Sequence, residues 1–530
     1  MMTRPPFDVQ PVTLEGRLVR LEPLDVERHL AGLAEVGLEP SLWLYVVDRP
    51  ATSDDLRRYL EGAEAERQAG RMLPFVTHER ATGRPVGMSR YMSIEPAHRR
   101  LEIGHTWVAP ALRDAGRRYG TPVYVTDIAA IETAADELRL AFPDPWLRLY
   151  SVKANDVPSV IGTVIAAGLH GASVVSRGEW ARASRAGLDD GRVALEGVGL
   201  TDTDLRAAIR AATRGRPPLW VALESPEEAT ILGRLAARAG LGTNGTARLD
   251  VLLRLNPAVE PETLRGLAVG RGAAKFGMTE SELSEAVDAG GGLHGPLRWR
   301  GIHLHIGSQL GAVDAWRDAV RRSLAVFALL RGYGPMNDFD TLDIGGGFPV
   351  ASDDPSTVPS PGRFARELPA VVDALPAHRR PTRWVVEPGR FLVARAGWLV
   401  GRVLHVRERD PRQIVIDTGM AELIRPALYG AWHPIHALTS LGRPVERWGP
   451  GATGTSWTRV EGPICESTDG LGDHDLPPLR RGDLVAIAAA GAYAASMAMR
   501  YNGRPRVAQV LLDQEGTLSR ASGGTRSRHS

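Results

Sequence analysis

The central part of the chain alternates between short apolar runs and longer stretches with apolar residues at helical spacing. Runs such as LYSVK (149–153), LWVAL (219–223) and VLLRL (251–255) are each followed by an Ala- and Arg-rich amphipathic stretch. This alternation is typical of β/α units around a parallel sheet. The number of repeats favours a (β/α)8 barrel, whose active site lies where strands end and loops begin.

The pattern changes after about residue 395. Segments such as GWLVGRVLHVRE (397–408) and GDLVAI (482–487) are rich in strand-forming residues and separated by Gly and Pro. They predict an antiparallel β-domain, which we expect to be a β-barrel. The polar residues 516–530 predict a disordered tail.

The first 114 residues form a separate α+β pattern. A strand-like segment (12–24), a helical segment (54–68) and the alternating LPFVTHE (73–79) follow one another. This order resembles the first half of a GCN5-related N-acetyltransferase. In that family the strand corresponding to WVAPALR leads into a loop that holds the coenzyme A pyrophosphate, and Arg113 and Gly116 would begin it here. The second half of such an enzyme is missing, so we expect a truncated unit over 1–114.

Length and composition narrow the function. The 530 residues exceed what one core usually serves, so two or three domains are expected. The net charge of +2, without a basic stripe, favours small-molecule chemistry over nucleic acid binding. The longest apolar run (484–499) is too short to span a membrane and is broken by Gly491 and Tyr493.

The single cysteine and the N-terminal residues both bear on the expected cellular compartment. Cys465 cannot form an intramolecular disulfide, and one thiol cannot build a Cys-rich zinc site, so we expect no metal. The first ten residues, MMTRPPFDVQ, lack the apolar core of a secretion signal. We therefore expect a cytoplasmic protein.

Lysine is almost absent from this Arg-rich chain. The sequence holds only Lys153 and Lys275. Lys153 ends an apolar strand, where a partly desolvated amine can lose its proton and form a Schiff base with a carbonyl, which a guanidinium cannot do. The alternative is a lysine present by chance on the surface. For Lys275 we expect an anchoring role in a loop, through bonds to carbonyls.

Two glycine- or histidine-containing motifs follow later apolar strands. HLHIGSQL (303–310) offers His305, whose ring could lie on an aromatic cofactor, and Ser308, a hydroxyl donor to phosphate. LDIGGGFP (342–349) holds three glycines that let backbone amides approach a phosphate. Taken singly, a structural histidine and a tight turn are the commoner explanations.

A third motif, WVVEPGR (384–390), ends another strand. Glu387 could pair with a protonated ring nitrogen and Arg390 could bind an anion. A surface ion pair is the alternative when this motif is considered alone. Lys153 and these three motifs together are far more specific than any one of them.

In combination, these motifs resemble the fold type III pyridoxal-phosphate enzymes, the alanine racemase-like barrel group, and are most similar to the diaminopimelate decarboxylases. The resemblance covers about residues 118–515. Further family-like stretches are AAKFGM (273–278), RPALYGAWHPI (425–435), GPICESTDGL (462–471) and GAYAASMAMRYNGRPR (491–506). The resemblance implies a segment contributing to the β-domain (118–147), a cofactor-binding barrel (148–394) and the β-domain proper (395–515).

The resemblance also implies pyridoxal 5'-phosphate and the residues that hold it. Lys153 would bind the cofactor covalently, His305 would stack on its ring, and Glu387 would keep the ring nitrogen protonated. The phosphate would be surrounded by Ser308, Gly345, Gly346, Gly347 and Arg390, and Tyr493 would add a further contact.

Cys465 is implied to be the proton donor. In the family the Cys-Glu-Ser motif enters the active site of the neighbouring subunit, which implies an obligate homodimer with two shared sites. An inert buried thiol is the alternative. The catalytic residues are then Lys153, His305 and Cys465.

The resemblance implies decarboxylation of meso-diaminopimelate to L-lysine and CO2. Arg390, Arg425 and Tyr429 would bind the far carboxylate, Glu466 the far ammonium, and Tyr493 would also contact the substrate. Related ornithine-type enzymes commonly have Cys-Asp where this chain has Cys465 followed by Glu466.

Departures from the family pattern keep other functions open. Arg177 stands where Gly is usual, Ser173 replaces an acid, and Leu200 stands where Lys is frequent. A related decarboxylase of secondary metabolism, acting on a modified or carrier-bound amino acid, could share every cofactor motif. From another class, the N-terminal unit could make the protein an N-acetyltransferase or a bifunctional enzyme.

Overall fold

The computed structural model divides the chain into two compact units. It describes residues 10–15, 19–38, 50, 52–70, 72–79, 83–95, 100–104, 109–243, 247–263, 267–272, 274–332, 338–351, 357–438, 456–513 and 516–522. The first unit holds the described residues before position 108, and the second holds those from Ala109 onward.

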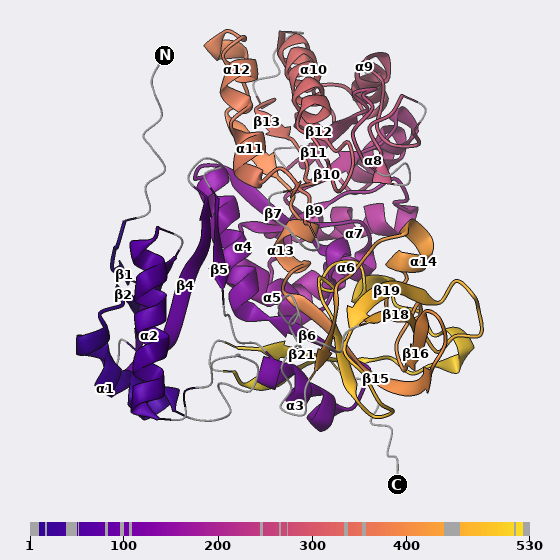
Figure 1. Ribbon diagram of the computed structural model, residues 1–530. Helices are drawn as coiled ribbons and strands as arrows, with labels where there is room; N and C mark the ends of the chain where they lie inside the picture. Colours follow the sequence, from indigo (N-terminus) through magenta and orange to yellow (C-terminus); the bar gives the residue numbers. More distant parts are fainter. Residues whose placement is uncertain are drawn as a thin grey trace. The chain divides into compact units, whose positions relative to one another are not determined.

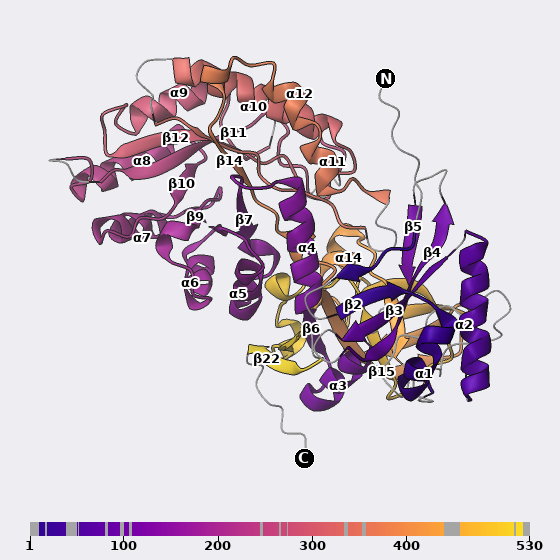
Figure 2. The same cartoon turned by 90° about the vertical axis from the view of Figure 1, so that its left-hand side faces the viewer.

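The first unit is a five-stranded antiparallel sheet with two helices (Figure 2). Its elements are β1 (Leu14–Glu15), β2 (Val19–Pro23), α1 (Val26–Gly37), α2 (Ser53–Gln68), β3 (Leu73–Glu79), β4 (Pro85–Glu95) and β5 (Arg100–Gly104). Helix α2 begins at a capping box in which Thr52 and Asp55 satisfy each other's backbone amides. Both helices pack on the sheet through a small apolar core that includes Leu33, Leu60 and Val76.

One element predicted for this unit is wrong. Arg113 and Gly116 were expected to begin a coenzyme A loop, but both lie in helix α3 (Ala109–Tyr119), which belongs to the second unit. A Cβ on Gly116 would come within 3.3 to 3.4 Å of Leu484, Thr121 and Val400. This glycine therefore lets α3 lie close to the second unit's sheet. Trp107 and Val108 fall outside the described residues, and the acetyltransferase resemblance of 1–114 rests on sequence alone.

The predicted barrel is confirmed. Eight parallel strands close on themselves, with β14 pairing with β7. Figure 1 labels six of the eight, β7 and β9 to β13. The strands are β7 (Leu147–Ser151), β8 (Gly171–Val174), β9 (Val193–Leu195), β10 (Trp220–Leu223), β11 (Leu249–Leu255), β12 (Leu297–Leu304), β13 (Thr341–Asp343) and β14 (Arg383–Val386).

One helix, α4, precedes β7, and other helices follow the barrel strands. Together they are α4 (Ile128–Ala141), α5 (Pro158–Ala166), α6 (Arg177–Arg185), α7 (Asp202–Thr213), α8 (Pro226–Arg238), α9 (Glu280–Ala289), α10 (Asp314–Gly332), α11 (Pro361–Ala365), α12 (Leu368–Val372), α13 (Arg390–Val393) and, in the β-domain, α14 (Arg425–Tyr429). Several begin at a side-chain cap, as at Ser176, Thr201 and Ser225.

The two faces of each barrel strand bury different partners. Leu149, Trp220 and Leu252 belong to a cluster that fills the barrel interior, whereas neighbours such as Tyr150 and Val221 pack outward against the helices. Because alternate strand residues point to opposite faces, both faces must be apolar. This requirement explains the nearly continuous apolar runs in the sequence.

The strand-rich, mainly antiparallel domain is also confirmed, but the pairing of its described strands gives a sheet and not the closed β-barrel that was expected. Its nine strands are β6 (Val123–Asp127), β15 (Gly397–Arg407), β16 (Arg412–Ile416), β17 (Ile435–Leu438), β18 (Ser456–Glu461), β19 (Gly470–Leu476), β20 (Leu484–Ile487), β21 (Ala508–Leu512) and β22 (Leu518–Ser522). They form one sheet in which most pairs are antiparallel and two, β16 with β18 and β6 with β21, are parallel. Strand β6 pairs with β15 and β21, so the chain contributes to this sheet before it enters the barrel.

The predicted disordered tail is wrong for its first part. Residues Leu518–Ser522 form β22 and pair with β21, and Leu518 is buried. Backbone pairing and one buried leucine order a segment that is otherwise polar. The rest of the predicted tail, 523–530, lies outside the described residues.

Within the described ranges, no helix has both the length and the apolar character that a membrane span requires.

Candidate active site

The side chains singled out in the sequence meet at the carboxyl end of the barrel strands. Lys153 lies in a single 3₁₀ turn directly after β7, and His305 follows β12. The glycine triplet follows β13, and Glu387 follows β14. Strand ends far apart in sequence are adjacent here because β14 closes the barrel against β7.

A loop from the β-domain is fastened beside Lys153. The amide of Tyr493 donates to the Ala154 carbonyl at 2.7 Å, and the Ser496 hydroxyl donates to the Lys153 carbonyl at 3.0 Å. The Asn155 side chain donates to the Gly491 carbonyl at 3.0 Å. Tyr493 has a φ of 60°, an unusual conformation for a non-glycine residue that these bonds hold in place.

Lys153 opens into a cavity of about 480 Å³. Its wall contains seven of the predicted residues: Lys153, His305, Ser308, Arg390, Arg425, Tyr429 and Tyr493. A smaller cavity of about 20 Å³ shares Lys153, His305 and Arg390 and adds Gly347 and Glu387. The larger volume suits a small-molecule cofactor with its substrate.

Arg390 and Ser308 form the anion-binding side of the cavity. The guanidinium donates to the Ser308 hydroxyl from Nε at 3.2 Å and from Nη2 at 3.1 Å, and lies 4.7 Å from the centroid of the Tyr493 ring. Burial lowers the pKa of Arg390 to about 10, with a contribution from nearby Arg425, so the group stays a cation at neutral pH. A buried cation of this kind favours an anionic ligand.

The glycine triplet is required by crowding of the backbone. A Cβ on Gly345 would lie 2.2 Å from the Leu304 carbonyl oxygen, and one on Gly346 would lie 2.2 Å from that of Glu387. Gly347 meets the Gly307 carbonyl in the same way, at 2.4 Å. The amide of Gly346 also donates to His305 Nδ1 at 3.3 Å, which orients the imidazole ring.

A buried ionizable cluster lies beneath Glu387. Nε2 of His303 is 3.3 Å from Glu387 Oε2 and 3.9 Å from Glu196 Oε2. Burial, together with the charge of Glu387, raises the pKa of Glu196 to about 8, and the same two causes raise the pKa of Asp343 well above its usual range. Burial lowers the pKa of His303 to about 4. At neutral pH Glu196 is therefore protonated while His303 is neutral.

These residues fit pyridoxal phosphate. Oε1 of Glu387 is buried and has no hydrogen-bond donor among the described residues. A protonated pyridine nitrogen would supply that donor. Lys153 would bind the aldehyde, and Arg390, Ser308 and the Gly347 backbone line the part of the cavity that suits a phosphate.

Sequence reasoning missed His303, Glu196, Asp343 and Arg254. Arg254 lines the cavity and forms a buried ion pair with Glu224, whose second carboxylate oxygen accepts from the Gly277 amide at 2.8 Å. The signal was available: each missed residue is an ionizable side chain within or directly after an apolar barrel strand. His303 and His305 are also two apart, so they point to the same face.

Cys465 and Glu466 are not brought into this cavity of their own chain. They lie between β18 and β19, where Cys465 is exposed and Glu466 accepts a hydrogen bond from the Tyr501 hydroxyl. Lys275 does not line the cavity, but its ammonium lies 5.3 Å from the centroid of the Phe276 ring, which does.

The chain is similar to known decarboxylases in sequence and structure. Residues 128–394 match the family model of the pyridoxal-dependent decarboxylase, pyridoxal binding domain. Diaminopimelate decarboxylase of Vibrio cholerae is 35% identical over 420 residues, covering 78% of this chain and 93% of the relative. That of Pseudomonas aeruginosa is 36% identical over 410 residues, covering 77% and 91%.

A solved structure agrees with the sequence relatives. Diaminopimelate decarboxylase from Helicobacter pylori, complexed with L-lysine, superposes with a TM-score of 0.68 at 28% identity, covering 78% of this chain and 96% of that one. With the barrel, the lysine after β7 and the carboxylate after β14, these matches establish that the chain belongs to the diaminopimelate decarboxylase family of pyridoxal-phosphate enzymes.

Proposed function

We propose that this protein decarboxylates meso-diaminopimelate to L-lysine and CO2, as a step of lysine biosynthesis. One observation carries the proposal: Lys153 shares its cavity with three buried arginines. Arg254 is paired with Glu224, but Arg390 and Arg425 form no ion pair with a carboxylate among the described residues. A reactive amine beside two buried cations suits an amino acid with more than one carboxylate.

The cofactor, when bound, supplies an electron sink that stabilises the carbanion left by the departing CO2. We propose that Lys153 holds the cofactor through its amine and that Glu387 keeps a proton on the ring nitrogen. His305, oriented by the Gly346 amide, would stack on the cofactor ring. Ser308, Gly345 to Gly347 and Arg390 would hold the phosphate.

The carboxylate of the substrate that is not released as CO2 needs its own binding residues in the cavity. Arg425 is buried there, and its guanidinium carbon lies 5.9 Å from the centroid of the Tyr429 ring. We propose that Arg390, Arg425, Tyr429 and Tyr493 bind the far carboxylate. A substrate with only one carboxylate would leave a buried guanidinium without an anion.

We propose a cytoplasmic homodimer in which each chain completes its partner's site. Cys465 would carry a proton on Sγ to the substrate Cα in the partner's cavity, and Glu466 would bind the far ammonium there. Support comes from the exposure of Cys465 and from the position of both residues away from the cavity of their own chain.

The first test exploits the two lysines. Reduction of the cofactor-loaded protein with borohydride should attach a pyridoxyl group to Lys153 and leave Lys275 unmodified, as read by peptide mass spectrometry. Lys153→Ala should lose visible cofactor absorbance and turnover, whereas Lys275→Arg should retain both. A pyridoxyl group on Lys275, or turnover by Lys153→Ala, would refute the assignment.

The second test identifies the substrate. Purified protein is offered meso-diaminopimelate, lysine, ornithine and glutamate, and CO2 release is measured. Only meso-diaminopimelate should be turned over, and Arg425→Gln should raise its KM by about tenfold or more because one charged contact is lost. Turnover of ornithine in preference would contradict the proposal, and failure of every free amino acid would favour a modified or carrier-bound substrate.

The third test concerns the shared site. Mixing inactive Lys153→Ala with inactive Cys465→Ala should restore about a quarter of wild-type activity, because half of randomly mixed dimers are hybrids with one intact site each. No recovery after subunit exchange would place Cys465 outside its partner's site.

A further inference from the structure

The chemistry proposed above leaves one buried acid of the barrel without a role. Glu196 directly follows β9 and is 5% exposed, and its amide donates to the Val174 carbonyl at 2.8 Å. In the closed barrel, β7 and β8 separate β9 from β14. Glu196 therefore meets Glu387, which follows β14, across the interior of the barrel.

The two carboxyl groups lie close enough to share a hydrogen bond. A side-chain hydrogen bond joins Glu196 to Glu387, and together with His303 they place their polar atoms within 4.8 Å of one another. An ionised carboxylate can only accept, so this bond requires one proton on the pair. At neutral pH the proton is on Glu196, because burial and the charge of Glu387 raise the pKa of Glu196 to about 8.

The other neighbours of Glu196 leave its proton available for this bond. The Trp220 indole donates to Glu196 Oε1 at 3.1 Å, so that oxygen is an acceptor. His303 lies 3.9 Å from Oε2 and is neutral at neutral pH, since burial lowers its pKa to about 4. Burial and the charges of both glutamates raise the pKa of Asp343, which faces the same pair. Further charges that act on His303 come from Arg254, Glu224 and Lys153.

Glu387 depends on this bond because it has no cation of its own. Within the described ranges, neither a lysine nor an arginine forms an ion pair with Glu387, and its one ionizable partner is the neutral His303 at 3.3 Å. A hydrogen bond to a carboxylate favours the charged form, and such a charge-assisted bond is stronger than one between neutral groups. The bond from Glu196 therefore favours an ionised Glu387 and restricts its orientation.

We propose that Glu196 is a positioning residue: its protonated carboxyl donates the hydrogen bond that keeps Glu387 ionised and oriented toward the ring nitrogen of the cofactor. The inference rests on the role proposed above for Glu387 and extends it to a second acid. Glu196 acts through Glu387, because it lines neither the cavity at Lys153 nor the smaller one beside it.

The test compares two substitutions of Glu196 in the cofactor-loaded enzyme. Glutamine can accept from Trp220 through its oxygen and donate to Glu387 through its nitrogen, but it cannot ionise. Leucine can do none of these. Glu228→Gln is the matched control: burial raises the pKa of Glu228 to about 7, but its carboxylate accepts from the Glu224 amide at 2.7 Å and has no contact with Glu387.

We expect cofactor affinity and kcat to separate the two variants. Glu196→Leu should bind the cofactor about tenfold more weakly and lose kcat to a similar extent, because a hydrogen bond to a charged group is lost. Glu196→Gln should retain both values within about threefold, since it keeps the donor. Glu228→Gln should match the wild type.

The visible absorbance of the bound cofactor, followed from neutral to alkaline pH, provides a readout besides turnover. Ionisation of Glu196 replaces the donor by a second anion beside Glu387, so the wild-type spectrum should change as pH rises. The change should persist in Glu228→Gln and disappear in Glu196→Gln. Its persistence in Glu196→Gln would assign it to another group and overturn the proposal, and so would equal losses of affinity in Glu196→Gln and Glu196→Leu.

A double-mutant cycle separates this inference from the role of Glu387. In a Glu387→Gln background, Glu196→Leu should have little further effect on cofactor affinity, because the carboxylate that accepts the bond is gone. Wild-type affinity and turnover in Glu387→Gln would refute the role of Glu387 itself. An impaired Glu387→Gln with an unimpaired Glu196→Leu would refute only the inference about Glu196. If Glu196→Leu does not fold, the pH response of Glu196→Gln still decides the question.

Discussion

Two buried clusters of the same residue types behave differently in the two units. In the barrel, Glu196, His303 and Glu387 place their ligand-type atoms within 4.8 Å of one another, and in the first unit Glu22, His29 and His78 do the same. All six residues are at most 7% exposed. The difference lies in what surrounds them.

Arginines neutralise the cluster of the first unit. Glu22 lies 2.5 Å from Arg20 and 2.6 Å from Arg28. Burial alone would raise the pKa of Glu22, but the two guanidinium groups outweigh it and the pKa lies below its usual value. His29 accepts from the Asp25 amide through Nδ1 and turns Nε2 toward Glu22 at 3.5 Å. This glutamate is therefore a structural anion whose partners are already present.

The barrel cluster has no comparable cation among its described contacts. Glu196 accepts from the Trp220 indole at 3.1 Å, and the pKa of Glu196 rises to about 8. Glu387 keeps one buried oxygen without a donor among the described residues. The comparison teaches that a compensated buried acid indicates structure, whereas an uncompensated one indicates a place reserved for a ligand's positive charge.

The strongest test of this contrast is the same substitution in both clusters. Glu387→Gln should lower kcat/KM by at least about 100-fold, because an amide cannot stabilise a protonated ring nitrogen. Glu22→Gln should leave kcat/KM unchanged. Steady-state decarboxylation at saturating cofactor measures both values. A fully active Glu387→Gln enzyme would contradict the claim that Glu387 binds a positive charge of the ligand.

Next in size is the pH dependence of stability. The pKa of Glu196 is about 8 in the folded protein, against 4.5 for a glutamate side chain in water. The contribution of Glu196 to stability is therefore complete below about pH 4.5 and is lost as pH rises toward 8. Glu196→Gln does not titrate. The free energy of unfolding of the variant should therefore rise relative to that of the wild type as pH increases toward 8, by a few kcal/mol, at about 1.4 kcal/mol for each unit of pKa shift.

Urea unfolding of wild type and variant from about pH 5 to about pH 9 measures this gain. Exposed Glu227, replaced by Gln, provides the control and should follow the wild-type curve. A pH-independent difference between Glu196→Gln and wild type would show that the acid is ionised throughout.

The smallest effect is expected in the first unit. Glu22→Gln leaves Arg20 and Arg28 without their shared anion and should destabilise that unit by about 1 kcal/mol, since both arginines are partly exposed. Limited proteolysis under mild urea reports this loss. Arg84→Gln, which breaks an exposed pair with Glu35, should change stability by less than about 0.5 kcal/mol. If the two variants are cleaved equally fast by the protease, burial does not strengthen the ion pairs of Glu22.

Much of the second unit's architecture could be predicted from local pattern. The apolar runs that became β7, β10 and β11 had to be buried on both faces, which only a barrel covered by helices allows. Lys153, His305 and Glu387 were found for a related reason, since each interrupts or ends such a run. The same reasoning applied to His303 and Glu196 would have found the cluster beneath Glu387.

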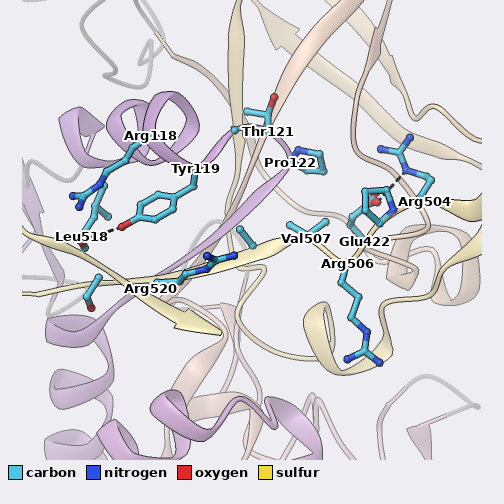
Figure 3. Close-up of a pocket in the computed structure, with 14 residues that line it drawn as sticks. Arg118, Tyr119, Thr121, Pro122, Glu422, Arg504, Arg506, Val507, Leu518 and Arg520 are labelled. Carbon is cyan, nitrogen blue, oxygen red and sulfur yellow. Dashed lines mark hydrogen bonds and ion pairs between the residues drawn. The ribbon is translucent and has the colours of Figure 1, made fainter. Parts of the chain in front are cut away.

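Failures of prediction came where distant segments decide the structure. Gly116 suggested a loop, but it is a close-packing point of α3 against side chains from Val400 and Leu484. Residues 518–522 are polar, yet β21 provides them with a pairing partner. Arg118 and Arg520 likewise line one cavity (Figure 3), although no local sequence pattern connects them.

The sequence by itself determined the strand and helix succession and the amine and acids placed at strand ends, because burial and backbone geometry act over a few neighbouring residues. Only the tertiary structure decided that Glu387 is buried with Glu196 and His303, because these residues follow or lie in separate barrel strands and meet only when the barrel closes. The arginines that compensate Glu22, by contrast, are its near neighbours in the chain, Arg20 and Arg28.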